Sequence, residues 1–97
     1  MYMRFIEIGL SPKATKRLLI KFAEPDLEVH FGSKTGSTYI DHGDKKKREN
    51  YLRRHSVMED WRRVNPGSLS RYLLWGDSTD LGKNLRTFLK DFEIEVE

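Results

Sequence analysis

The spacing of apolar residues changes once along the chain, and this change limits the folds that the sequence can adopt. Residues 17–31 place an apolar side chain at nearly every second position, on both sides of the turn sequence Glu24-Pro25-Asp26. A period of two puts such side chains on one face of a β-strand. Residues 2–9, YMRFIEIG, are rich in aromatic and branched side chains. The pattern predicts three strands joined as an antiparallel meander.

After Gly43 the apolar residues recur at helical spacing. Asp44 is a suitable N-cap for a helix that continues to about His55, and Ser56 can cap a second helix over residues 57–64. The second helix is predicted from the recurrence of Val57, Met58, Trp61 and Val64.

Two further helices follow. The turn sequence Asn65-Pro66-Gly67 predicts the end of the second helix, and Ser68 can cap a third over residues 69–75. Ser78-Thr79-Asp80 precedes the clearest apolar stripe of the chain, formed by Leu81, Leu85, Phe88, Leu89 and Phe92. Residues 93–97 are compatible with a short edge strand or with a frayed end.

A run of strands followed by a run of helices predicts the α+β class. We expect an N-terminal three-stranded antiparallel sheet covered by three to four C-terminal helices. The 97 residues suit a single small domain. Its sheet is expected over about residues 2–32, a loop over 33–43 and the helical part over 44–92.

Composition excludes several classes of protein. The chain contains no cysteine, which excludes disulfides and thiolate zinc sites. No run approaches the roughly 20 apolar residues of a membrane-spanning helix. The first ten residues lack the order of charged and apolar residues found in a secretory signal. We therefore expect an intracellular protein that does not contact membranes.

Basic residues are concentrated in the middle of the chain. The net charge is only +3, but nine Lys and Arg lie between Lys45 and Arg71 against three acids, and the part after Trp75 is acidic. The basic helical face over residues 45–63 could bind the phosphates of DNA or RNA without reading their sequence. Tyr51, Trp61 and Tyr72 could stack on unpaired bases there. The same face could equally be a solvated surface with aromatic residues in the core. The residues that would contact a nucleic acid or another partner are Lys46, Lys47, Arg53, Arg54, Arg62 and Arg63.

A second set of polar residues on the first helix has a structural explanation. Asp44, Arg48, Tyr51 and His55 fall on one stripe. We expect Asp44 to bond Arg48 one turn later, and Tyr51 and His55 to bond the loop that precedes the helix. We call these four residues the polar clasp.

Histidines and carboxylates do not form a recognisable catalytic or metal site. His30, Asp41 and His42 lie near Asp44 and His55 in the sequence, but without the spacing of metal ligands or of an activated nucleophile. We predict no catalytic residue, no metal and no cofactor.

One ordered set of short motifs lies between residues 29 and 76. It consists of HFG (30–32), YIDHGD (39–44), Arg48, YLRRH (51–55), Trp61 and LLWG (73–76). This set resembles a family of small proteins encoded by large DNA viruses of algae and protists and by some bacteriophages. The resemblance departs at Ile40, where family members often have threonine, and in the variable segment 65–67. It implies a viral context and no particular mechanism.

This context favours a non-enzymatic structural or virion-associated protein, such as a minor capsid component, that acts through contacts with viral or host proteins. Exposed parts of Trp61 and Trp75 and the strand edges would make those contacts. Sequence-nonspecific binding of nucleic acid is the alternative, and inhibition of a host protein is a third possibility. The expected location is the virion or the host-cell cytoplasm or nucleus. The sequence leaves the oligomeric state open.

Overall fold

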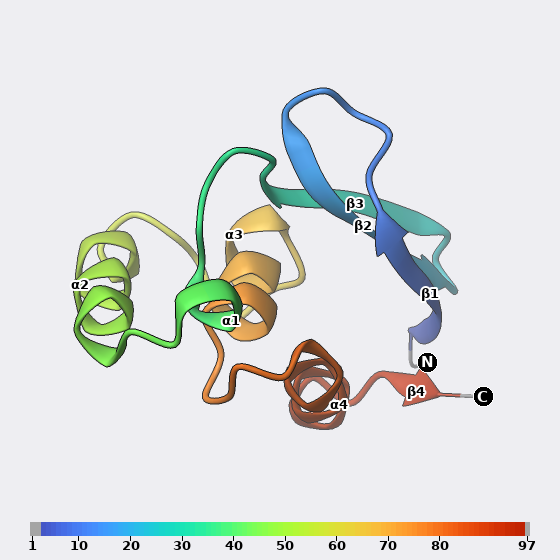
Figure 1. Ribbon diagram of the computed structural model, residues 1–97. Helices are drawn as coiled ribbons and strands as arrows, with labels where there is room; N and C mark the ends of the chain where they lie inside the picture. The colour runs from blue at the N-terminus through green and yellow to red at the C-terminus, as the bar shows by residue number, and fades with distance from the viewer. Residues whose placement is uncertain (1–2, 97) are drawn as a thin grey trace.

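The computed structural model describes residues 3–96 of the chain (Figure 1). Three strands come first along the chain, followed by a series of helices and a final short strand. In chain order they are β1 (Arg4–Leu10), β2 (Lys16–Ala23), β3 (Leu27–Ser33), α1 (Tyr39–His42), α2 (Lys45–Ser56), α3 (Pro66–Leu69), the π-helix η1 (Ser70–Leu74), α4 (Leu81–Asp91) and β4 (Glu95–Val96).

The sheet has the order β3-β2-β1-β4. The first three strands form the predicted antiparallel meander, with Ile20 of β2 between Ile8 and Val29 of its neighbours. The α+β class is confirmed, but a purely antiparallel three-stranded sheet is incomplete because β4 adds a short strand parallel to β1. Tyr2, the first residue of the predicted first strand, lies outside the described residues.

The core lies between one face of the sheet and the helices α3, η1 and α4. Alternation along β2 and β3 turns Leu18, Ile20, Phe22, Val29 and Phe31 toward this face, where all five are buried. Leu73 and Leu74 of η1 and Phe88 and Leu89 of α4 complete the same apolar cluster. On the opposite face Lys21 pairs with Glu7 and Glu28, as suits a solvated sheet surface.

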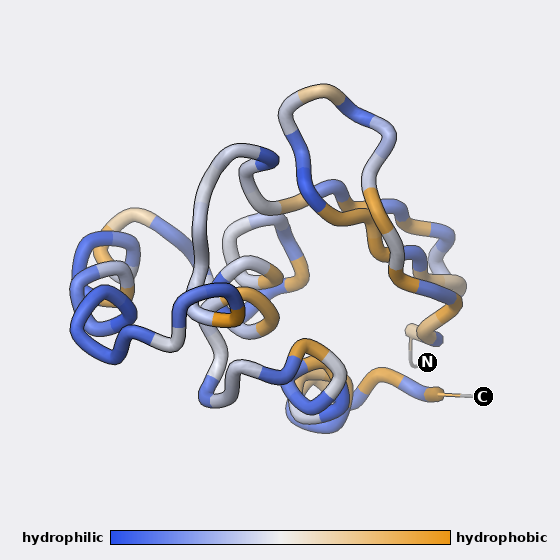
Figure 2. Tube along the Cα trace, in the orientation of Figure 1, coloured by the Kyte–Doolittle hydropathy of each residue, from blue (hydrophilic) through white to orange (hydrophobic). Residues whose placement is uncertain are grey.

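Helix α2 does not cover the sheet. It lies on the far side of α3 and η1 from the strands (Figure 1), and most of its length is hydrophilic (Figure 2). The expectation that all the C-terminal helices cover the sheet is therefore wrong for α2. No helix within residues 3–96 combines the length and the apolar composition that crossing a bilayer requires.

The predicted helix over residues 57–64 is replaced by turns and bends. Ser56 donates its hydroxyl back to the Arg53 carbonyl, so it closes α2 instead of capping a new helix. Val57 and Met58, which were expected on an apolar helical face, are 82% and 78% exposed.

The segment predicted to stop that helix starts another one. The Asn65 side chain accepts from the Ser68 amide, and the Ser68 hydroxyl accepts in turn from the Asn65 amide. Pro66 occupies the first turn, where a missing N–H costs nothing. Asn65 is thus the N-cap of α3, and Ser68 lies inside the helix that it was expected to cap.

Candidate functional site

Helix α2 carries three polar stripes that make different contacts. The first is the polar clasp, which faces the body of the fold. Two further stripes follow at the same helical spacing, Lys46–Glu49–Arg53 and Lys47–Asn50–Arg54. The local reason for the helix is its N-cap, since the Asp44 carboxylate accepts from the amides of Lys46 and Lys47 at 3.0 and 3.1 Å.

The clasp has different partners from those expected. Because the Asp44 carboxylate is occupied by capping, Arg48 reaches the segment after η1 instead. Its Nε donates to the carbonyls of Trp75 and Gly76 at 3.1 and 2.9 Å, and its terminal nitrogen pairs with Asp77 at 2.8 Å. The end of a helix leaves such carbonyls without partners, so a cation there satisfies them.

Three rings hold α2 against this segment. The Tyr51 ring lies between Trp75, at 4.2 Å and nearly parallel, and His55, at 4.1 Å. His55 Nδ1 lies 3.0 Å from Glu59, not against the loop before the helix. Burial raises the pKa of Tyr51 to about 12, so the phenol stays neutral at physiological pH.

The aromatic residues expected to stack on bases are mostly occupied within the protein. Both faces of Tyr51 are covered by rings. The guanidinium of Arg71 lies 5.3 Å from the centre of the Trp61 ring and 4.7 Å from that of Tyr72. These contacts favour a structural role for the three aromatic residues over base stacking.

Four of the six predicted phosphate-binding cations share two carboxylates, which offset part of their charge. Glu49 lies within ion-pair distance of both Lys46 and Arg53. Asp60 lies within ion-pair distance of both Arg62 and Arg63, and the side chains of these two arginines are otherwise almost wholly exposed. Exposed pairs of this kind contribute little to stability, but each acid lowers the attraction of its cations for an anion.

Lys47 and Arg54, the other two, make no ion pair within residues 3–96. The Asp44 carboxylate feels the charge of Lys47 but is engaged with backbone amides. Both cations border a surface hollow of about 260 Å³, which we call the cationic hollow. It is lined by Ser37, His42, Lys47, Asn50, Arg54 and Trp75, and no carboxylate is among them.

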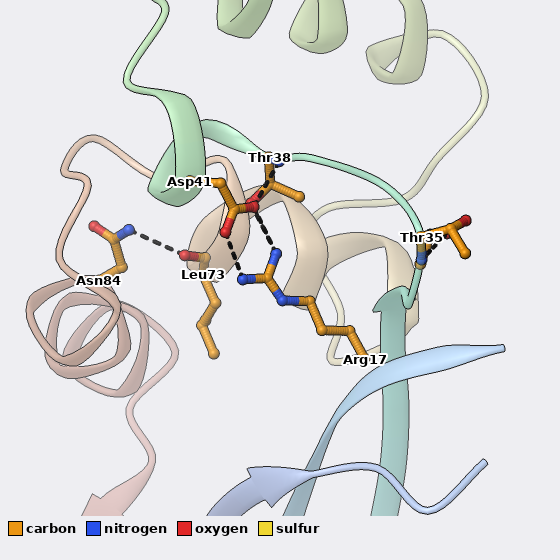
Figure 3. Close-up of polar contacts among 7 residues, drawn as sticks. Arg17, Thr35, Thr38, Asp41, Leu73 and Asn84 are labelled. Atoms are coloured by element: carbon orange, nitrogen blue, oxygen red, sulfur yellow. Dashed lines mark hydrogen bonds and ion pairs between the residues drawn. The ribbon is translucent and has the colours of Figure 1, made fainter. Parts of the chain in front are cut away.

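The wall opposite α2 is fixed to the sheet by one ion pair. Arg17 of β2 binds both oxygens of Asp41 at 2.7 Å, and Asp41 also accepts from the amide and the hydroxyl of Thr38 (Figure 3). These bonds form a capping box around α1, a helix that lies inside the predicted loop 33–43. Ser37, which precedes the N-cap of α1, and His42, the last residue of α1, are thereby held beside the cationic hollow.

Asp41→Asn is expected to remove this charge pair while retaining an acceptor for Thr38. The Arg17 guanidinium holds the pKa of the Asp41 carboxyl well below its usual range. The contribution of this ion pair to the free energy of unfolding is therefore complete above the pKa of an aspartate in the unfolded chain, about 3.9. It is lost as the pH falls below that value. Because the pair is partly exposed, we expect a loss of about 1 kcal/mol at neutral pH that shrinks in acid. Urea unfolding at several pH values measures it.

Asp26→Asn is the matched control, since Asp26 lies in an exposed turn and makes no ion pair within the described residues. The free energy of unfolding of the Asp26→Asn variant should match that of the unmodified protein at every pH. A difference between Asp41→Asn and the unmodified protein that stays constant through the acid range would contradict the pairing.

Histidines and carboxylates singled out in the sequence are dispersed. His30 bonds Ser11, His42 accepts from the Asp44 amide, and His55 bonds Glu59. Within residues 3–96 no three His, Asp or Glu side chains come together where they could hold a metal ion.

A larger groove of about 420 Å³ adjoins the cationic hollow. It runs between the segment 32–38, α2 and α3, and it shares Ser37 and Trp75 with the hollow. Its lining is rich in hydroxyl groups, from Thr15, Ser33, Ser37, Thr38 and Ser70.

Sequence spacing alone could have separated the two cationic stripes of α2. Lys47, Asn50 and Arg54 stand at i, i+3 and i+7, and the acid at i−3, Asp44, is the expected N-cap, whereas Lys46 and Arg53 share Glu49. Trp75 and Ser37 could not have been added, because tertiary packing brings them to α2 from distant parts of the chain.

Comparison with known proteins gives one match. Residues 6–55 match the model of a family described as a family of unknown function, DUF5754. The matched segment contains most of β1, all of β2, β3 and α1, and nearly all of α2, but not Trp75. Neither a curated protein nor a solved structure matches the chain significantly.

Proposed function

We propose that this chain, which belongs to the DUF5754 family of unknown function, is a non-enzymatic protein that binds nucleic acid through its phosphates. One observation carries this proposal. Lys47 and Arg54 lie one above the other on α2, make no ion pair among the described residues and border a hollow without a carboxylate. Cations placed in this way are available to neutralise phosphates, the interaction that dominates nucleic-acid affinity.

Binding of this kind does not depend on base sequence. Both faces of Tyr51 are covered by rings, and Arg71 lies over Trp61 and Tyr72, which reduces the surface available for stacking. Phosphate contacts fix a strand in place but carry no sequence information. DNA and RNA are therefore both ligands. The four paired cations Lys46, Arg53, Arg62 and Arg63 add a weaker, diffuse attraction.

Binding to oligonucleotides across a salt series tests the proposal. The ligands are DNA and RNA strands of mixed sequence with unphosphorylated ends, followed by fluorescence anisotropy. We expect affinity to fall steeply with salt. The double variant Lys47→Gln/Arg54→Gln should reduce the log–log slope by about 2, because two phosphate contacts are lost.

The matched control is Lys46→Gln/Arg53→Gln, which removes the same charge from the same helix but from the stripe that contains Glu49. It should change the slope by less than half as much. Equal effects of the two double variants would show that only net charge matters. No binding of the unmodified protein at low salt would reject the proposed function.

Contact with other proteins, as in a virion component, is the second candidate. It is favoured by Val57 and Met58, which lie side by side at the end of α2 and are almost fully exposed. Adjacent exposed apolar side chains are typical of a protein contact. Absence of nucleic-acid binding together with a fixed stoichiometry in purified particles would favour this function.

A further inference from the structure

The cationic hollow presents mainly hydrogen-bond donors. Lys47 and Arg54 donate only, and Asn50 and Ser37 add an amide and a hydroxyl that make no hydrogen bond within the described residues. With two positive charges and no carboxylate in the lining, the complementary ligand is a compact group that carries two negative charges and several acceptor oxygens.

His42 also lines the hollow, but its own ring donor is covered. Its Nδ1 accepts from the Asp44 amide at 2.8 Å, so the ring hydrogen lies on Nε2. That Nε2 is covered from solvent and has no hydrogen-bond partner. Recognition of a ligand in the hollow therefore rests on the other donors, chiefly Lys47 and Arg54.

The walls of the hollow are positioned before a ligand arrives. Three of its residues occupy one face of α2, which Arg48 and the ring stack hold against residues 75–77. Ser37 and His42 are held by the Arg17–Asp41 pair. The backbone of such a site needs little rearrangement on binding, so the main entropic cost is the ordering of the exposed Lys47 and Arg54 side chains.

A phosphate at the end of a strand fits this chemistry better than a phosphate within one. An internal phosphodiester carries one negative charge and must leave the hollow in two directions. A terminal phosphate monoester carries about 1.5 to 2 negative charges near neutral pH and has three free oxygens. The adjoining groove offers both apolar surface, including Leu74 and Trp75, and hydroxyl groups for the nucleoside that bears it.

We propose that the cationic hollow binds the terminal phosphate of a nucleic-acid strand, so that the protein prefers phosphorylated ends. This inference rests on the proposed function, since it specifies which phosphate occupies the site. Lys47 and Arg54 neutralise its charge, Asn50 and Ser37 orient its oxygens, and the groove beside Trp75 receives the terminal nucleoside.

Paired oligonucleotides that differ only in phosphorylation of one end test the inference. Each end is phosphorylated in turn, and binding is measured at physiological ionic strength. We expect one of the two phosphorylated strands to bind at least about tenfold more tightly than the unphosphorylated strand, which corresponds to about 1.4 kcal/mol. Lys47→Gln and Arg54→Gln should each abolish most of this preference. Lys46→Gln/Arg53→Gln should retain it.

The possible outcomes separate the two proposals. Equal binding of phosphorylated and unphosphorylated strands would overturn the terminal-phosphate site and leave the proposed function standing. A preference for the phosphorylated strand that persists in both Lys47→Gln and Arg54→Gln would mean that the terminal phosphate binds elsewhere. That result would also overturn the terminal-phosphate site. A free nucleoside monophosphate that competes as well as the phosphorylated strand would identify a nucleotide site and not a strand-end site. If no strand binds, both proposals fail. Circular dichroism confirms that the variants, all at exposed positions, remain folded.

Discussion

Gly76→Ala is expected to destabilise the protein by about 3 kcal/mol, one of the largest effects of a single added methyl group in this fold. A Cβ at this buried position would meet the carbonyl oxygen of Tyr72 and, at 2.7 Å, the side chain of Asn84. Neither neighbour can move cheaply. The carbonyl belongs to the η1 backbone, and the Asn84 amide donates to the carbonyls of Leu73 and Ser78 while accepting from the Ser78 amide.

Thermal and urea unfolding followed by circular dichroism measure this loss. Gly9→Ala is the control, because nothing lies within 4 Å of a Cβ at that exposed strand position. It should be neutral or slightly stabilising, since alanine loses less backbone entropy than glycine on folding. Similar unfolding curves for the two variants would show that the 73–78 segment is not tightly packed.

Trp75→Ala is expected to cost about 3 kcal/mol and to release α2 from the rest of the fold. The indole stacks on Tyr51 and meets the edge of His42 at 5.4 Å, so its removal takes away the surface on which α2 rests. The Arg48 bonds to the backbone of residues 75 and 76 would remain, but without packing behind them. The cationic hollow would lose one wall.

Hydrogen exchange measures the release directly. Amides of α2 should exchange far faster in Trp75→Ala, whereas those of β2 and β3 keep protection up to the global stability. Trp61→Ala is the control, since Trp61 lies in the turn segment, contacts Glu59 and Arg71, and makes no ring contact with α2 among the described residues. Unchanged exchange in α2 would mean that the ring stack does not hold the helix.

Local sequence patterns predicted those helices and strands that are determined by residues within one segment of the chain. The alternation along β2 and β3, the Asp44 cap and the apolar stripe of α4 are each complete within one segment, and the structure contains all three. The predicted helix over 57–64 failed because the Ser56 hydroxyl serves the helix before it. The spacing of apolar residues does not show whether a serine between two predicted helices bonds the helix before it or the helix after it.

Contacts between distant segments were beyond such patterns. The two-residue strand β4 exists only because α4 delivers it beside β1. Similarly, sequence spacing places Glu49 beside Lys46 and Arg53, but it does not show that Asp60 pairs with Arg62 and Arg63 in a segment that was expected to be helical. The hollow beside Lys47 and Arg54 depends on Ser37 and Trp75, which the fold alone brings together.

The short strand β4 also determines how this protein can be tethered. The Glu95 amide donates to the Met3 carbonyl, so the two ends of the described chain lie side by side. In Figure 1 both ends lie at the sheet, across the molecule from α2. A fusion partner or a surface attached at either end would therefore leave α2 and the cationic hollow facing outward.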